Sequence, residues 1–133
     1  MKWLVSFLLI LSFNCYATSD STCLSAMLKH EAQTESKVAT RAVLDVTLNR
    51  VAKSRKTACR VIKEPGAYSW HHKNYKFKVI EKDLTRLSEI GNMSPVLDED
   101  YLWFFNKRLH PIWAKKLKCD RIIGMHKFCK EKK

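Results

Sequence analysis

The stretch that decides the fold runs from residue 23 to residue 51 and reads CLSAMLKHEAQTESKVATRAVLDVTLNRV. Its apolar residues recur at helical spacing and predict two helices with a short break at 34–36. Ser21 or Thr22 can cap the first helix, and Ser36 opens the second. The faces expected to be buried are Leu24, Met27, Leu28 and Glu31 in the first helix and Val38, Ala39, Ala42, Val43, Val46 and Val51 in the second.

Outside this helical pair the signals for secondary structure are shorter. Glu64-Pro65-Gly66 indicates a turn, and 67–70 and 75–80 then predict the two strands of a hairpin. Further helices are predicted at 84–91, after the cap signal Ser94-Pro95, and from Pro111. The basic tail after Phe128 is expected to fray. The predicted class is α+β, a mainly helical small domain with one short β-hairpin.

The amino end has the pattern of a secretory signal peptide over residues 1–17. Lys2 precedes an apolar run at 3–13, which is shorter than the roughly 17–25 residues that span a bilayer. Cys15 and Ala17 supply small residues for cleavage after Ala17, and an uncleaved anchor is the alternative. We therefore expect an exported protein, periplasmic or secreted, whose mature domain spans 18–133 and meets a membrane only through this segment.

Composition supports one packed domain and a polyanionic partner. The chain has 133 residues, 46% hydrophobic and 11% aromatic, with only three Gly and three Pro, which excludes collagen-like and linker-like chains. Lys and Arg number 25 against 13 Asp and Glu, a net charge of +12 that favours an anionic polymer. No nucleic-acid motif is present, so an exported chain is expected to meet the cell wall instead, as a monomer.

The cysteines left after cleavage are Cys23, Cys59, Cys119 and Cys129. An even number in a small exported chain predicts two disulfides, for which three pairings are possible. We favour Cys23–Cys59 and Cys119–Cys129, because each pair would brace one half of the chain. Zinc binding is the rival, and the absence of any Cys-x-x-Cys spacing in the sequence argues against it.

Glu31 is the leading candidate for catalysis. It lies on the apolar face of the first predicted helix, where a carboxylate is costly unless it is paired or has a raised pKa. A raised pKa suits a general acid, and an ion pair with a Lys or Arg is the structural alternative. Glu35 could stand beside it if the helix continued, or could cap the next helix. Because Thr34 breaks the His-Glu-x-x-His zinc motif, we expect neither a metal nor a cofactor.

Two aromatic stretches could line a groove for sugar rings. They are Tyr68-Ser69-Trp70 and Trp103-Phe104-Phe105, and plain core packing is the alternative for at least half of these rings. The second stretch belongs to an aromatic run at 101–105 whose period cannot be assigned to a helix or a strand.

The order of short motifs resembles the SleB-like cell-wall hydrolases, the spore-cortex-lytic family. The segments that carry the resemblance are Cys23-Leu24, residues 30–35, residues 43–51, Cys59 with Val61-Ile62, residues 66–70, residues 111–114 and residues 123–128. They extend over nearly all of the expected mature chain. The chain departs from the family pattern at Gln33-Thr34, where Arg-Gly is usual, and at Met125, where Asn is usual.

The resemblance implies a lysozyme- or transglycosylase-like domain that cleaves peptidoglycan glycan strands between N-acetylmuramic acid and N-acetylglucosamine. It implies lytic transglycosylation with Glu31 as acid/base, and a phage endolysin or a bacterial remodelling enzyme would both fit. Glu35, Ser69, Trp70 and His126 are the residues expected to support the site or hold the sugars. Two alternatives stay open: hydrolysis of the same bond, and a cationic cell-wall-binding or antibacterial protein that has lost catalysis.

Overall fold

The computed structural model describes residues 20–68, 70–71 and 76–133 of the chain. The predicted signal peptide at 1–17 and the candidate Ser69 therefore lie outside the described residues. Within these ranges, no helix is long and apolar enough to cross a membrane.

The predicted helical pair forms. The first helix covers residues 20–32, and α2 follows at Lys37–Ser54 with the Ser36 hydroxyl accepting a hydrogen bond from the Ala39 N–H at 3.2 Å. Ser21 and Thr22 lie inside the first helix, so the cap predicted there is wrong. A short helix that the sequence did not predict, α3 at Ala58–Lys63, is capped by the Thr57 side chain. The next helix along the chain is α4, at Glu81–Gly91.

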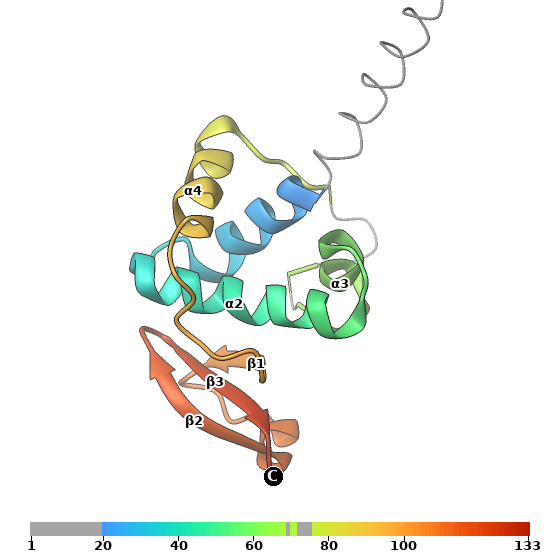
Figure 1. The fold of residues 1–133 in the computed structure, drawn as a ribbon, viewed down its shortest axis with the longest axis vertical. Helices are drawn as coiled ribbons and strands as arrows, with labels where there is room; N and C mark the ends of the chain where they lie inside the picture. Colours follow the sequence, from blue (N-terminus) through green and yellow to red (C-terminus); the bar gives the residue numbers. More distant parts are fainter. Residues whose placement is uncertain (1–19, 69, 72–75) are drawn as a thin grey trace, which may run out of the picture.

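The second predicted helix, α2, is the centre of the molecule. Residues 39–47 are all buried, so α2 is enclosed on every side along its first half and not only on one stripe. Figure 1 shows why: the other helices lie on one side of α2 and the sheet lies on the other. Two members of the predicted stripe fall outside this enclosure, because Val38 is 50% exposed and Val51 is half-buried.

A three-stranded antiparallel sheet covers the other side of α2. Its strands are β1 at Tyr101–Asn106, β2 at Leu117–Ile123 and β3 at His126–Glu131, in the order β1-β3-β2. The short 3-10 helix at Ile112–Lys116 begins after Pro111, as predicted. The predicted class, a mainly helical α+β domain, is confirmed.

The hairpin predicted at 67–70 and 75–80 is wrong, since no described residue of either range is in a strand. Aromatic contacts organise this segment instead: the Phe77 ring lies 6.1 Å from the Trp70 ring and 5.7 Å from the His71 ring. Ile80 then precedes α4, and its N–H donates to the Asp83 carboxylate at 3.0 Å. The alternation of apolar and polar residues at 75–80 therefore does not correspond to a strand among the described residues. The strands that pair in the sheet lie later in the chain.

Two further predictions in the last third of the chain are corrected. No helix follows Ser94-Pro95, because the buried Asp45 carboxylate accepts the N–H groups of Val96 and Leu97 at 2.7 and 3.0 Å. The tail beyond Phe128 does not fray: β3 continues to Glu131, and the Cys129 side chain within it is fully buried.

Both favoured disulfides form. Cys23–Cys59 joins the first helix to α3, and Cys119–Cys129 joins β2 to β3. Each half of the chain therefore has a covalent brace, as the pairing argument anticipated.

Candidate active site

Glu31 lies one residue before the end of the first helix and is half-buried. Burial raises the pKa of its carboxyl group above the ordinary value of 4.5. A hydrogen bond from the Trp70 side chain and the positive charge of Arg50 pull the pKa down, but burial is the largest effect. The result is a carboxyl group that holds its proton more strongly than an exposed or ion-paired one, which is the property of a general acid.

Trp70 forms a platform beside Glu31. Its indole ring stacks on the exposed His30 ring, with centroids 4.4 Å apart and planes 11° from parallel. On its other sides the indole meets the Tyr68 ring at 6.0 Å and the Phe77 ring edge-on at 6.1 Å. A ring held from three sides keeps a fixed orientation, so the indole N–H group that lowers the pKa of Glu31 is held in place.

Three more residues complete the surroundings of Glu31: Tyr68, which the sequence analysis proposed only as groove lining, and Thr47 and Arg50, which it gave no role in the site. The Tyr68 hydroxyl and Thr47 Oγ1 share a hydrogen bond of 2.6 Å, and the Arg50 guanidinium lies 5.8 Å above the Tyr68 ring. Arg50 is itself fixed, since its Nε donates to the Leu102 carbonyl at 2.6 Å. Burial raises the pKa of Tyr68 and the charge of Glu31 adds to this, so the phenol stays protonated.

In the sequence, these residues could be found only by their places next to motifs already noted. Thr47 and Arg50 are on one turn of α2, and Arg50 belongs to the Leu-Asn-Arg-Val segment that carried the family resemblance. Tyr68 stands two residues before Trp70, within the aromatic stretch already singled out as groove material.

Glu35 lies beyond the end of the first helix and belongs to a different cluster. Its Oε1 accepts the Met125 N–H at 2.8 Å and lies 3.3 Å from His126 Nδ1. Both side chains are largely buried, with 11% of Glu35 and 7% of His126 exposed. The helix ends at residue 32, so the continuation that would have stacked Glu35 beside Glu31 is absent. These contacts support the turn between β2 and β3.

His126 closes this cluster from the sheet. Its ring meets the Phe104 ring edge-on at 5.3 Å, and Phe104 in turn lies 6.2 Å from Tyr68. Burial lowers the pKa of His126 below 6.5, and the Glu35 carboxylate opposes this shift without reversing it. The imidazole is therefore neutral at neutral pH. A continuous aromatic wall runs from His30 and Trp70 through Tyr68 and Phe104 to His126.

A hollow of about 520 Å³ adjoins this wall. It is bounded by α2, by the loop after α3, by β1 and by the 3-10 helix, and it shares Arg50 and Phe104 with the surroundings of Glu31. Its lining residues are Arg50, Lys53, Ser54, Val61, Glu64, Pro65, Gly66, Ala67, Leu102, Trp103, Phe104 and Trp113.

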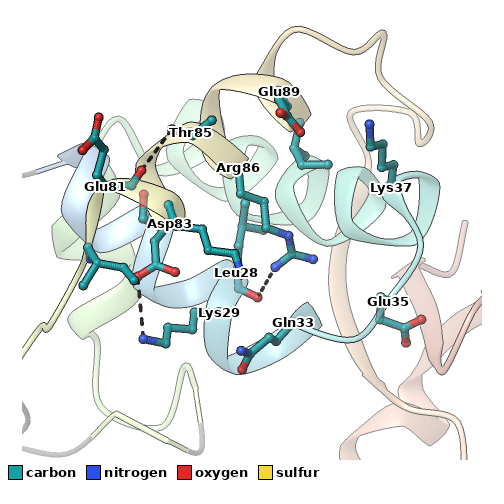
Figure 2. Close-up of a pocket in the computed structure, with 14 residues that line it drawn as sticks. Leu28, Lys29, Gln33, Glu35, Lys37, Glu81, Asp83, Thr85, Arg86 and Glu89 are labelled. Carbon is teal, nitrogen blue, oxygen red and sulfur yellow. Dashed lines mark hydrogen bonds and ion pairs between the residues drawn. The ribbon is translucent and has the colours of Figure 1, made fainter.

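A larger hollow of about 810 Å³ lies between the first helix and α4 (Figure 2). Leu28 and Lys29 line it, and Glu31 does not. Lys29 lies 3.6 Å from Asp83 in its lining, and Arg86 donates to the Thr40 hydroxyl at 3.0 Å. The hollow includes Glu35 but lies outside the surroundings of Glu31.

Comparisons with known proteins identify the family and the fold. A family model described as Cell Wall Hydrolase matches residues 34–129. The catalytic domain of the Bacillus cereus SleB protein superposes with a TM-score of 0.64 at 24% identity, covering 85% of this chain and 91% of that one. The catalytic domain of the germination-specific lytic transglycosylase SleB from Bacillus anthracis gives 0.68 at 25% identity, covering 84% and 94%. No curated protein matches the chain significantly.

Proposed function

The chain belongs to the cell wall hydrolase family, and from this premise we propose that it is a lytic transglycosylase of peptidoglycan with Glu31 as its acid/base. The bond cleaved in this proposal joins N-acetylmuramic acid to N-acetylglucosamine. The observation that carries it is Glu31 itself, a half-buried carboxyl group with a raised pKa, set against an aromatic platform. The likeness to the SleB lytic transglycosylase of Bacillus anthracis supports the type of reaction.

The proposed reaction needs one carboxyl group. Protonated Glu31 donates its proton to the glycosidic oxygen as the bond from that oxygen to the muramoyl C1 breaks. The Glu31 carboxylate then accepts the proton of the muramoyl C6 hydroxyl while O6 bonds to C1. A 1,6-anhydro ring results, no water is consumed, and Glu31 recovers its proton.

The neighbours of Glu31 suit both stages of this reaction. Burial favours the protonated form at the start, whereas the Trp70 hydrogen bond and the Arg50 charge stabilise the carboxylate after donation. Glu35 already accepts the Met125 N–H and faces His126, so we assign it to support of the site. A retaining hydrolase would need a second carboxylate as nucleophile, and Glu35 is engaged elsewhere.

We assign sugar binding to the aromatic wall. Trp70 stacks with the exposed His30 ring, and we propose that this pair contacts a sugar ring. We include Ser69 in the proposal because it precedes Trp70 in the chain. The His126 side chain is buried against Phe104 and Glu35. We therefore propose that His126 contributes to sugar binding indirectly, by holding the aromatic wall in position. An enzyme of this kind works outside the cytoplasm, which agrees with the predicted signal peptide.

The test is a digest of purified peptidoglycan by the oxidised, signal-free protein, with released muropeptides read by mass spectrometry. We expect products lighter by one water than hydrolysed ones, and none from Glu31→Gln. Glu89→Gln, which makes the same change at an exposed site on α4, serves as the matched control and should keep full activity. Products at full hydrolysed mass would move the assignment to a muramidase or glucosaminidase.

A fold check separates loss of catalysis from loss of structure. Since burial disfavours the charged form of Glu31, the glutamine variant should unfold at no lower a temperature than the parent at pH 7. If a folded Glu31→Gln protein lysed cell walls as well as the parent does, the chain would be a cationic cell-wall-binding protein that acts without catalysis.

A further inference from the structure

We infer that the hollow of about 520 Å³ beside Arg50 binds the anionic stem peptide that branches from muramic acid, so that the enzyme recognises peptide-bearing glycan. This inference rests on the proposed function and specifies its substrate. It concerns the residues on the far side of Arg50 and Phe104 from Glu31, none of which takes part in the proposed proton transfers.

The position of the hollow suits a branch of the substrate. Arg50 bridges the two places, since its charge acts on Glu31 while its side chain lines the hollow. Phe104 bridges them as well, lining the hollow and meeting the Tyr68 ring at 6.2 Å. A glycan strand lying along the aromatic wall would carry its lactyl branch within reach of this opening, because the branch leaves the same sugar whose C1 reacts.

The charged residues that line the hollow of about 520 Å³ favour an anionic ligand. Among the described residues of the lining, Glu64 is the one acidic side chain, and its carboxylate is held by Lys56 at 2.7 Å. Lys53 is 61% exposed and lies 3.6 Å from Glu131, which is 68% exposed, so this contact is a solvated surface pair of small energy. Arg50 and Lys53 therefore give the hollow a positive balance. A neutral acetylated sugar has no charged group that would pair with these two cations.

The uncharged walls suit short side chains. The indole of Trp113 is 46% exposed and is held edge-on against the Phe105 ring at 5.6 Å, which gives a rigid face. Trp103, Val61 and Leu102 supply further apolar lining. A stem peptide combines small methyl side chains with free carboxylates, which matches apolar walls and two cations. The volume is within the range of about 300–1,000 Å³ that is usual for ligand pockets.

The test compares two substrates: intact glycan strands, and the same strands after an amidase has removed the stems. We expect Lys53→Glu to lower the ratio of kcat/KM on intact over stripped strands by about fivefold, and Trp113→Ala to lower it in the same direction. Lys82→Glu, an equal charge reversal at an exposed position of α4, should leave the ratio at the parent's value. If both substrates lost activity equally, or if neither changed, the stem-peptide assignment would be overturned.

A binding measurement keeps this inference separable from the proposed reaction. The Glu31→Gln protein is titrated with soluble stem tetrapeptide while indole fluorescence is recorded, and binding should saturate and be weakened by Lys53→Glu. A parent protein that binds the peptide but releases no product from either strand would refute the proposed function alone. A protein that cleaves glycan but shows no saturable peptide binding would refute this inference alone.

Discussion

At the scale of the residue, the behaviour of Glu31 comes from three competing effects. Burial raises its pKa, while the Trp70 hydrogen bond and the Arg50 charge lower it. A general acid works only while protonated, so the alkaline limb of the pH profile of kcat/KM should follow this pKa. Any change that removes a lowering effect should carry that limb to higher pH.

Trp70→Phe provides this change, because phenylalanine keeps an aromatic ring and lacks the N–H group. We expect the alkaline limb of kcat/KM to move to higher pH, whatever the loss in the maximal rate. Phe105→Leu is the control: its ring packs against Trp113, so the substitution leaves Trp70 and its indole N–H group in place and should leave the limb unchanged. Steady-state kinetics on soluble glycan fragments across a pH series measures both. A limb that moved to lower pH in Trp70→Phe would contradict the assignment of Glu31.

The sequence could single out Glu31 and Trp70, since a carboxylate on an apolar helical face and an aromatic stretch are both local patterns. Arg50 and Thr47 were out of reach, because they meet Glu31 and Tyr68 only after α2 packs across the first helix. Glu35 shows the opposite limit. Its partners lie 90 residues further along the chain, so spacing alone left its role open between a paired carboxylate and a cap.

At the scale of the element, the two longest helices could be predicted and the sheet could not. The helices follow from apolar residues at helical spacing within a single segment, and Ser36 caps the second helix. The strands depend on pairing between β1 and β3, whose partners are more than about twenty residues apart. An irregular register between Tyr101 and Trp103 also disturbs the alternation in β1, which explains why the aromatic run at 101–105 showed no readable period.

The turn between β2 and β3 depends on Gly124. Its φ of +61° lies in the left-handed region, and an added Cβ would meet the Glu35 carboxylate and approach the Ala39 Cβ to 3.0 Å. We expect Gly124→Ala to destabilise the protein by about 1–3 kcal/mol and to lower activity through displacement of Glu35. Urea denaturation measures the first effect and the peptidoglycan digest the second.

Gly91→Ala is the matched control for this substitution. Gly91 ends α4, and a Cβ added there would meet no atom within 4 Å, so alanine should be neutral or slightly stabilising. Equal stability of the two alanine variants would show that the close approach of Gly124 to Glu35 is unimportant.

At the scale of the whole molecule, two disulfides hold two different halves. Cys23–Cys59 closes a loop of sequence separation 36, and Cys119–Cys129 one of separation 10. Chain entropy gives about 4 kcal/mol for the first and about 3 kcal/mol for the second. The paired alanine variants should therefore lose stability in that order in urea denaturation. A larger loss from the Cys119–Cys129 variant would mean that packing around the fully buried Cys129 outweighs loop closure.

The number and positions of the cysteines were enough to predict the two bridges. An even set of four cysteines pointed to two bridges, and the simplest bracing argument chose the pairing that forms. What they could not supply was the enclosure of α2, because burial on every side requires both the helices and a sheet made from the last third of the chain.

The contact between Glu35 and the Met125 N–H joins a residue near the start of the fold to one near its end. Phe128, among the most deeply buried side chains of the core, arrives later still in synthesis. A polypeptide that ends before β3 therefore carries Glu31 but lacks Phe128 of the core and the His126 end of the aromatic wall. We therefore expect the chain to fold and to act only once its last strand is in place.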